Sequence, residues 1–340
     1  MYQEQVTIKD IAKKLNLSLS TVSRALRNHP DVSQETRKKV LALAEKLHYE
    51  KNPLALSLRN QKTFSIGVVL PEVANSFFSS VLSGIQHVAH EAGYNLLITL
   101  SDESAAREQE NLKHLWRYRV DGILAAVSKE TSSFEHFEAI LGKIPIVFFD
   151  RIWANPQVSK VTVDDYEGAF TATKHLLAIG CKRIAHIAGP SNLQVTQNRL
   201  EGYLAALRQS NLSVDQELII DGGFSRDFGR QATQQLLALP QRPDAIFCVN
   251  DRSAIGCILT LKERQVAIPE EIAVIGFTNS ETATIVSPTL STMAQPTLAL
   301  GRLSMNLMLK HLNQEDFIPE HQVLKTNLIV RQSTDRTPSS

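Results

Sequence analysis

The sequence has 340 residues, 43% of them hydrophobic, which is long enough for two or three domains that each bury an apolar core. Its three cysteines form no CxxC pair, which argues against a disulfide framework, and no apolar run approaches the length of a membrane span. The N-terminal residues lack the apolar segment of a signal peptide, so we expect a soluble, cytoplasmic protein.

The net charge of +1 hides an uneven distribution of charge along the chain. Residues 1–60 carry 11 Lys and Arg against 6 Asp and Glu, a balance of +5, whereas the remaining residues carry 25 against 29, a balance of −4. A basic N-terminal segment on a mildly acidic body is typical of a protein that contacts a polyanion through that segment.

Two short helical patterns follow each other at the start of the chain. Thr7 stands three residues before Asp10, the spacing of a capping box, and apolar residues then recur at helical intervals as far as Leu15. Ser18 is placed to cap a second helix, which is too short to be stable unless its apolar stripe packs against the first. The polar face of that second helix would suit the major groove of DNA, although an ordinary helical hairpin with a solvated face explains the same pattern.

A third helix is predicted from Gln34 to about Leu47, with Ser33 as its cap, so that three helices can close a small core. The Asn-Pro pair at 52–53 is a helix-start signal, but the helix that it opens can extend only to about Arg59. So short a helix is marginal alone. Its leucines either dock on the body of the protein or act as an apolar wedge between DNA base steps.

From Phe64 onward, apolar runs rich in β-branched residues alternate with helical patterns. The predicted strands are 65–70, 94–100, 122–127, 145–149, 160–163, 183–187, 245–249 and 272–277. The predicted helices are 76–92, 105–118, 134–142, 167–179, 195–209, 228–239, 252–264 and 297–312. This alternation predicts α/β architecture with parallel sheets covered on both faces, and the span is long enough for two such lobes, divided near 150–163.

Polar and aromatic side chains follow these strands, where the carboxyl ends of the two sheets would border one cleft. The candidates are Phe77, Phe78, Asp150, Arg151, Asp164, Asp165, Arg199, Phe224, Asn250, Asp251 and Thr278. Planar polar groups beside aromatic rings suit a polyhydroxylated or heteroaromatic small molecule. The alternatives are that the carboxylates cap the following helices and that the two adjacent phenylalanines are ordinary core residues.

The common catalytic and nucleotide-binding signatures are missing from the sequence. No GxGxxG follows a strand, and there is no GxxxxGK[ST], HExxH or GxSxG motif. His175 and His186 lie in apolar surroundings and are predicted to be structural. We therefore expect a binding protein with no catalytic residues, no cofactor and no bound metal.

With these segments assembled, the sequence resembles the LacI/GalR family of bacterial transcriptional regulators over residues 6–333. The N-terminal part of the resemblance is carried by TIKDIAKKLNLSLSTVSRAL, VSQETRKKVLALAEKLHY and NPLALSLR. The body adds SIGVVLP, NSFF, RVDGILA, PIVFFDR, VTVDDYEGA, GCKRIAHIAGP, RLEGYLAAL, RPDAIFCVND, IPEEIAVIGF and PTLSTMAQP.

The resemblance implies a helix-turn-helix domain at 1–51 whose second helix lies in the major groove of DNA. Leu19, Ser20 and Arg24 match the base-reading positions, and an apolar Leu19 suits the methyl group of thymine. Residues that match positions near phosphates are Thr7, Ser18, Thr21, Ser23 and Asn28. Asp31 lies in the following loop, where a carboxylate is unsuited to contact DNA.

The same resemblance implies a hinge helix in the linker at 52–61. This helix would fold on operator DNA, and Leu58 matches the leucine that each subunit of a dimer inserts into the minor groove.

Residues 62–333 resemble a two-lobed, periplasmic-type sugar-binding fold that binds an effector and dimerises. The expected first lobe is about 62–163 and 293–320, the second is about 164–291 and 322–332, and 334–340 is a flexible tail. The expected effector contacts are Phe77, Phe78, Asp150, Arg199, Phe224, Asn250 and Thr278.

Three positions in the second lobe depart from the family pattern. Thr278 stands where many relatives carry Asp, and Leu193 and Val195 stand where several carry polar residues. Arg199 would then be the principal charged contact of that lobe, which favours an effector with an acidic or strongly accepting group.

The implied function is a transcriptional regulator, with repression favoured, that binds a pseudo-palindromic operator in double-stranded DNA. It would act as a homodimer, or alternatively a tetramer, away from the membrane, under the control of a sugar or related metabolite. The alternatives are a purine- or sugar-acid-responsive activator, a protein corepressor in place of the metabolite, a cytoplasmic sugar-binding protein, and an enzyme that acts on the cleft ligand.

Overall fold

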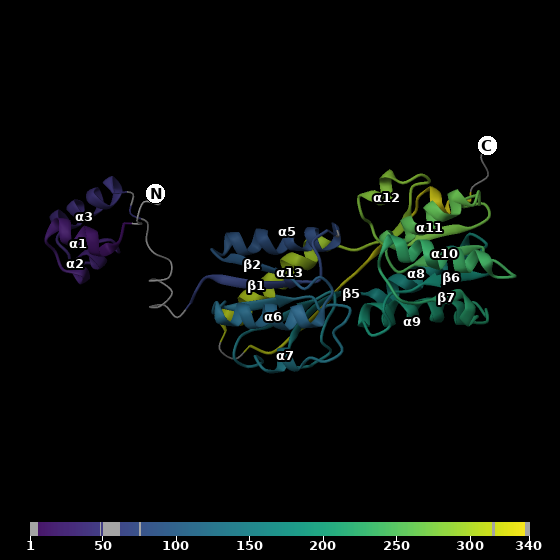
Figure 1. Cartoon of the computed structure of the whole chain (residues 1–340), viewed down its shortest axis with the longest axis horizontal. Helices are drawn as coiled ribbons and strands as arrows, with labels where there is room; N and C mark the ends of the chain where they lie inside the picture. Colours follow the sequence, from purple (N-terminus) through teal and green to yellow (C-terminus); the bar gives the residue numbers. More distant parts are fainter. Residues whose placement is uncertain (1–5, 48, 50–61, 75, 315–316, 337–340) are drawn as a thin grey trace. The chain divides into compact units, whose positions relative to one another are not determined.

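The structure, a computed structural model, describes residues 6–47, 49, 62–74, 76–314 and 317–336. The chain divides into two compact units, Met1–Thr63 and Phe64–Ser340 (Figure 1). The predicted hinge helix at 52–61, including Leu58, lies outside the described residues.

The N-terminal unit contains three short helices, α1 (Ile8–Leu15), α2 (Leu19–Ala25) and α3 (Gln34–Lys46). Ile11, Val22 and Val40, one from each helix, are fully buried against one another in its core. The predicted capping box is present, because Thr7 donates its backbone N–H and its hydroxyl to the Asp10 carboxylate at 2.8 and 2.7 Å.

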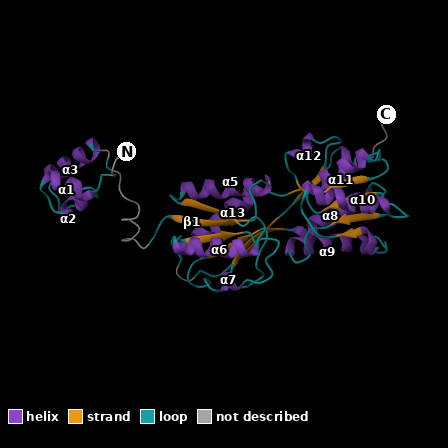
Figure 2. Ribbon diagram, in the orientation of Figure 1, coloured by secondary structure: helices purple, strands orange, loops and turns teal. Residues whose placement is uncertain are grey.

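The C-terminal unit has two lobes, each built on one six-stranded sheet (Figure 2). The first sheet has the order β11-β5-β4-β3-β1-β2, and all its strand pairs are parallel. Its strands are β1 (Ser65–Leu70), β2 (Asn95–Leu100), β3 (Gly122–Ala125), β4 (Ile146–Phe149), β5 (Ser159–Val163) and β11 (His321–Leu324). Helices α5 (Ser76–Glu91) and α13 (Thr297–Asn313) cover one face, and α6 (Ala105–Arg117) and α7 (Glu135–Glu138) cover the other.

The second sheet has the order β12-β10-β9-β8-β6-β7, with only β12 antiparallel to its neighbour. Its strands are β6 (Ile184–Ile187), β7 (Ile219–Ile220), β8 (Ala245–Cys248), β9 (Ala273–Thr278), β10 (Ser291–Ala294) and β12 (Asn327–Ile329). Helices α8 (Asp165–Ala178) and α9 (Gln194–Gln209) cover one face, and α10 (Arg226–Ala238), α11 (Asp251–Glu263) and α12 (Thr282–Ile285) cover the other. The predicted class, a helical head followed by two parallel-sheet lobes, is confirmed.

Two of the crossings between the lobes fall later in the chain than the expected boundaries. β10 belongs to the second sheet, so the first lobe resumes after residue 294, not at 293. β11 belongs to the first sheet, so the second lobe resumes after residue 324, not at 322. Neither β10 nor β11 has the apolar run of an inner parallel strand, because β10 reads STMA and β11 reads HQVL with alternate residues exposed. The sequence therefore does not reveal these two strands.

The first residues of the expected flexible tail, 334–336, pack against the second lobe. Thr334 is fully buried, and its hydroxyl lies 2.7 Å from the hydroxyl of Ser291 and 2.8 Å from Nε2 of His175. Arg336 donates to the backbone carbonyls of Pro269 and Asp244 at 3.0 and 2.9 Å. Small hydroxyl residues look like loop in the sequence, but here they pack under the second sheet.

Glycines allow the helix pairs to approach closely. A Cβ atom on Gly202 of α9 would lie 2.2 Å from the backbone oxygen of Tyr166 in α8. A Cβ on Gly301 of α13 would lie 2.0 Å from the backbone oxygen of Val81 in α5. No side chain fits at either place, so these glycines fix the positions of α5 and α9, which both carry residues of the site described below.

His186 is a buried core histidine on β6. Its ring lies between the rings of Tyr203 and Phe247, at centroid distances of 5.2 and 4.6 Å, and Nδ1 lies 3.0 Å from the carbonyl oxygen of Phe247. Nε2 has no hydrogen-bond partner among the described residues. Burial lowers the pKa of His186 to about 4, so the folded chain holds this ring neutral.

We expect His186→Phe to reduce the loss of stability on acidification. Below the ordinary histidine pKa, the ring of His186 is protonated in the unfolded chain. In the folded chain it stays neutral until the pH falls to about 4. The wild type therefore loses about 3 kcal/mol from this group between pH 6.5 and 4, at about 1.4 kcal/mol for each pH unit. Urea unfolding at several pH values measures this, and an equal pH dependence in the variant and the wild type would contradict it.

Candidate effector site and DNA-facing helix

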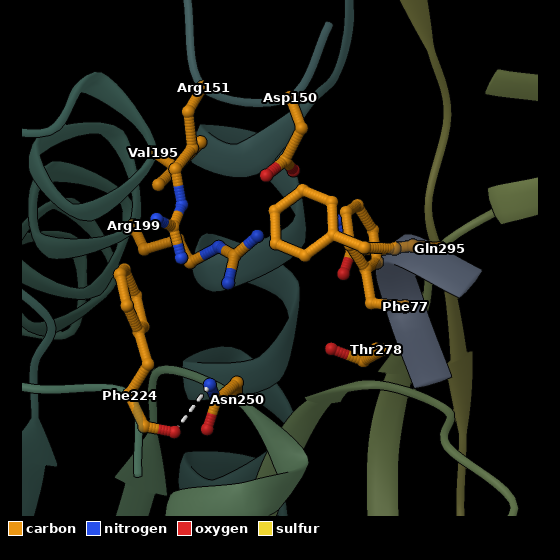
Figure 3. A pocket seen from close by; sticks show the side chains of 10 residues that line it. Phe77, Asp150, Arg151, Val195, Arg199, Phe224, Asn250, Thr278 and Gln295 are labelled. Carbon is orange, nitrogen blue, oxygen red and sulfur yellow. Dashed lines mark hydrogen bonds between the residues drawn. The ribbon is translucent and has the colours of Figure 1, made fainter. Parts of the chain in front are cut away.

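A pocket lies between the two lobes, at the carboxyl ends of their strands (Figure 3). It is lined by Phe77, Phe78, Asp150, Arg151, Val195, Arg199, Phe224, Asn250, Thr278 and Gln295. The seven effector contacts expected from the sequence are thus brought together, and three further residues join them. In parallel sheets the chain leaves each strand at the same edge, which explains why positions so distant in sequence converge here.

Arg199 is neutralised within its own lobe. Its Nε and Nη2 donate to Oδ1 of Asp165 at 2.8 and 2.7 Å, and Nη1 donates to the carbonyl oxygen of Val249 at 2.6 Å. The guanidinium also lies 3.8 Å from the ring centroid of Phe277. Burial raises the pKa of Asp165 to about 6 even beside this arginine. The structure therefore removes the reason to expect an acidic effector, since Arg199 already has a carboxylate partner.

Arg151 is held in a similar way by the first lobe. Its Nη1 donates to both carboxylate oxygens of Glu103 at 2.8 Å, and its side chain is only 5% exposed. The guanidinium lies 5.4 Å from the ring centroid of Phe78 and 4.7 Å from that of Phe224, which belongs to the second lobe. Arg151 is thus both a wall of the pocket and a contact between the lobes.

Asp150 is the charged group of the pocket whose carboxylate forms no hydrogen bond or ion pair with a side chain in the described part of the chain. Its carboxylate points into the cavity in Figure 3, and burial raises its pKa, while Arg151 and then Arg199 act in the opposite direction. Its backbone φ of 58° is left-handed, which is unusual for a residue other than glycine and is typical of binding sites. With two guanidinium groups and three carboxylates, counting Asp165 and Glu103, the ionised site has a net charge of −1.

The floor of the pocket is formed by Asn250 and Thr278. Oδ1 of Asn250 caps α11 by accepting from the backbone N–H of Ser253 at 2.8 Å, and its Nδ2 donates to the carbonyl oxygen of Phe224 at 3.0 Å (Figure 3). Thr278 has a φ of 138°, and a β-branched residue rarely adopts that conformation. It presents a neutral hydroxyl group at this end of the pocket.

The carboxylates that follow strands divide between capping and other roles. Asp164 caps α8 by accepting from the backbone N–H of Glu167 at 3.0 Å. Asp251 is buried, and it accepts from the hydroxyl of Thr292 and the backbone N–H of Ser280, each at 2.6 Å. Asp251 lines a neighbouring cavity and is absent from the lining of the first pocket.

The pocket is narrow in this conformation. The space open to water inside it is about 40 Å³, and one water needs at least about 10–15 Å³ on this measure. The neighbouring cavity measures about 200 Å³ and shares Asn250 and Thr278 with the pocket. In this conformation the pocket therefore has room for only about three water molecules, between residues of both lobes.

In the N-terminal unit, α2 presents a polar face to solvent. Leu19, Ser20 and Arg24 are exposed, with Leu19 at 47% and the Arg24 side chain at 56%. The hydroxyl of Ser18 accepts from the backbone N–H of Thr21 at 3.0 Å. Thr7, Ser18 and Asn28 are exposed, whereas Thr21 and Ser23 are half-buried. Thr7 and Ser18 are therefore helix caps, whatever else they contact.

Comparison with known proteins identifies both units. Residues 7–52 match the model of bacterial regulatory proteins of the lacI family, and residues 173–334 match a periplasmic binding protein-like domain. Catabolite control protein A of Priestia megaterium is 33% identical over 331 residues, which are 97% of this chain and 99% of that protein. The chain belongs to the LacI family.

Two further similar proteins match nearly the whole chain. The HTH-type transcriptional repressor CytR of Escherichia coli K12 is 33% identical, over 98% of this chain and 97% of that protein. The structure of the transcriptional regulator CelR–cellobiose complex has 28% identity and a TM-score of 0.75, and the match covers 97% of this chain and 100% of that one. The predicted class of DNA-binding transcription regulator is thereby confirmed.

Sequence reasoning does not reveal every lining residue of this LacI-family pocket. Gln295 follows β10, a strand with no apolar run, and its Nε2 has no partner among the described residues although the residue is only 8% exposed. Val195 is recognisable only as a departure from polar relatives, and Arg151 only as the residue after Asp150.

The described residues also include no helix long and apolar enough to cross a bilayer.

Proposed function

We propose that this LacI-family protein is a dimeric repressor whose operator affinity is set by a neutral, polyhydroxylated metabolite bound between the lobes. One observation carries the proposal. The same chain contains helix α2, which exposes hydroxyl groups and an arginine, and a pocket that is lined by residues of both lobes. In this proposal Leu19, Ser20 and Arg24 read base edges. The residues that lie near DNA phosphates in this proposal are Thr7, Ser18, Thr21, Ser23 and Asn28.

The charges of the pocket favour a neutral effector over an anionic one. Arg199 and Arg151 are already paired with Asp165 and Glu103, so an anion would have to compete with buried carboxylates. Asp150 is left to accept hydrogen bonds from hydroxyl groups, and Gln295 and Thr278 offer polar groups around it. Phe77 and Phe224 supply apolar surface for a ring. The cellobiose complex of a relative is consistent with this class of ligand.

The second element of the proposal is a homodimer formed through the first lobe. β2 is an edge strand, and Ile98 and Leu100 on it are exposed, as is Leu298 at the start of α13. All three lie at the face of the sheet that α5 and α13 cover. Apolar side chains along an unpaired edge are usually covered by a partner, and a two-fold dimer would place two heads on a pseudo-palindromic operator.

Mechanistically, the ligand acts through its different affinity for two lobe arrangements. A molecule that fits only when the lobes separate stabilises that arrangement, and one that bridges Asp150 and Asn250 stabilises the closed one. Either way, the change in operator affinity is limited by that difference, which in such systems is about 5–150-fold.

Fluorescence anisotropy with promoter fragments of the source bacterium tests the proposal. We expect binding to one pseudo-palindromic fragment about 10³-fold or more tighter than to random DNA at moderate salt. Cellobiose, ribose and other neutral sugars are then compared with gluconate and with purine bases. No preference for any fragment would refute DNA recognition, and a response to gluconate alone would refute the neutral effector. Recovery of the active sugar unchanged after long incubation argues against an enzyme.

A further inference from the structure

Glu103 joins two parts of the first lobe that are distant in sequence. It lies in the turn between β2 and α6, and its side chain is 18% exposed. Both of its carboxylate oxygens accept from Nη1 of Arg151 at 2.8 Å, and Oε2 also accepts from the backbone N–H of Lys129 at 2.7 Å. One carboxylate therefore fixes a wall of the pocket and the loop that follows β3.

The backbone carbonyl of Lys129 is held by the second lobe. The carbonyl oxygen of Lys129 accepts from Nδ2 of Asn192 at 2.8 Å, and Asn192 belongs to the second lobe. The same Nδ2 lies 3.5 Å from the carbonyl oxygen of Thr131. Lys129 is thus bound through its N–H to the partner of Arg151 and through its C=O to the other lobe.

The loop between these contacts is hydrogen-bonded to a buried carboxylate. The carboxylate of Glu108 is fully buried and accepts from the backbone N–H of Ser128 at 2.6 Å and from the hydroxyl of Thr131 at 2.8 Å. Nε2 of His136 lies 2.8 Å from the same carboxylate. Ser128 and Thr131, at the two ends of the segment 128–131, are therefore held by the same buried carboxylate.

The two turns that present Glu103 and Arg151 are conformationally strained. Asp102 and Glu103 have φ values of 49° and 60°, and Asp150, next to Arg151, has 58°. Residues other than glycine adopt this left-handed conformation at a cost, and they persist in it where the surroundings demand it, often at ligand clamps and switches. Both turns therefore hold their side chains in set positions.

We propose that Glu103 is a positioning residue that couples Arg151 in the pocket to the inter-lobe clasp formed by Lys129 and Asn192. A ligand that displaces Arg151 pulls on Glu103, which shifts Lys129 and opens or tightens the clasp. The role in signalling rests on the proposed function, because it assumes that the pocket binds the effector. The mechanical link itself is a property of the chain without ligand or DNA.

Hydrogen–deuterium exchange of the full-length protein, without DNA or sugar, tests the link. We expect Glu103→Gln to speed exchange about tenfold or more in residues 127–131 and also in 192–196, about the effect of losing one charged hydrogen bond. Asn192→Asp, at an exposed position, should speed exchange of the Lys129 amide. The double variant should be little faster than the faster single variant, because the two contacts act in series.

A second readout follows Trp153, one of only two tryptophans in the chain. Trp153 packs in a cluster that includes Leu193 and Phe224 of the second lobe. In a Trp116→Phe background, both Glu103→Gln and Asn192→Asp should make Trp153 more accessible to acrylamide. Arg252→Gln is the control, since it breaks another inter-lobe ion pair, with Glu72 at 2.5 Å, and should leave the Lys129 amide unchanged.

Two results would overturn the proposal. If Glu103→Gln loosens 127–131 while 192–196 and Trp153 stay as in the wild type, Glu103 only anchors its own loop. If the double variant multiplies the effects of the single ones, the two contacts are independent. Should Glu103→Gln fail to fold, Asn192→Asp alone decides, because an unchanged Lys129 amide in that variant also contradicts the link. Failure of these tests leaves the DNA-binding proposal intact.

Discussion

Arg199→Met is expected to lower the free energy of unfolding by about 3–5 kcal/mol, because it leaves the buried carboxylate of Asp165 without its partner. Arg199 and Asp165 are 4% and 3% exposed, so water cannot replace the lost guanidinium. Methionine keeps much of the side-chain volume between α8 and α9, which confines the change to charge and hydrogen bonding. Urea unfolding monitored by circular dichroism measures the difference.

Two further variants separate the buried pair from general effects on α9. Arg208→Met removes an arginine from the same helix, where the side chain is 63% exposed and 4.0 Å from Glu201, and should change stability by less than about 0.5 kcal/mol. Arg199→Met combined with Asp165→Asn should recover part of the loss, since no charge then stays buried. Equal stability of Arg199→Met and the wild type would show that the pair contributes little.

The pH dependence of the Arg199→Met defect has a definite sign. Burial already raises the pKa of Asp165 to about 6 in the wild type, so the folded chain binds a proton more readily than the unfolded chain. Stability from this group therefore falls as the pH rises from about 4 to 6. Without Arg199 the folded-state pKa rises further, so the defect should shrink on acidification. A defect that grows at low pH would contradict this assignment.

The inner framework of both lobes was readable from the sequence for a physical reason. Strands such as β1 and β8 are buried on both faces, so they appear as unbroken apolar runs. Residues just after such strands lie at the edge of the sheet that borders the pocket, which is why the sequence indicates Asp150 and Asn250 as lining residues. The edge strands β11 and β12 are short and contain no fully buried residue, and both pair with distant parts of the chain, so local pattern does not mark them.

The electrostatic state of the pocket was not readable from the sequence. Arg199 appears as an isolated charge in a helix, and nothing in its spacing shows that Asp165 lies 2.7 Å away across two helices. Asp165 itself reads as one of two successive capping residues, of which only Asp164 caps. The pairing depends on the close approach of α8 and α9 at Gly202, which is a property of the fold. The expectation of an effector with an acidic or strongly accepting group rested on an unpaired Arg199, and the structure pairs Arg199 with Asp165.

Arg24→Ala is expected to weaken binding to the cognate operator by about 1–3 kcal/mol for each head if Arg24 makes a bidentate base contact. Both heads of a dimer lose the contact, so the total loss is about 2–6 kcal/mol per operator. Arg24 lies on the exposed face of α2, and its Nη1 is 3.6 Å from Oδ2 of Asp31, a weak exposed pair that DNA can displace. Anisotropy titrations with the operator and with half-site variants measure the change.

The diagnostic feature of a base contact is its dependence on sequence. Arg24→Ala should lose little affinity for random DNA and should tolerate substitutions at one base pair of each half-site. Asp31→Asn is the matched variant, because it removes the carboxylate beside Arg24. The Asp31 carboxylate repels phosphates, so its removal should strengthen binding to all DNA sequences by a few-fold. If Arg24→Ala instead weakens cognate and random DNA equally and lowers the salt dependence, Arg24 touches only phosphate, and base reading falls to Leu19 and Ser20.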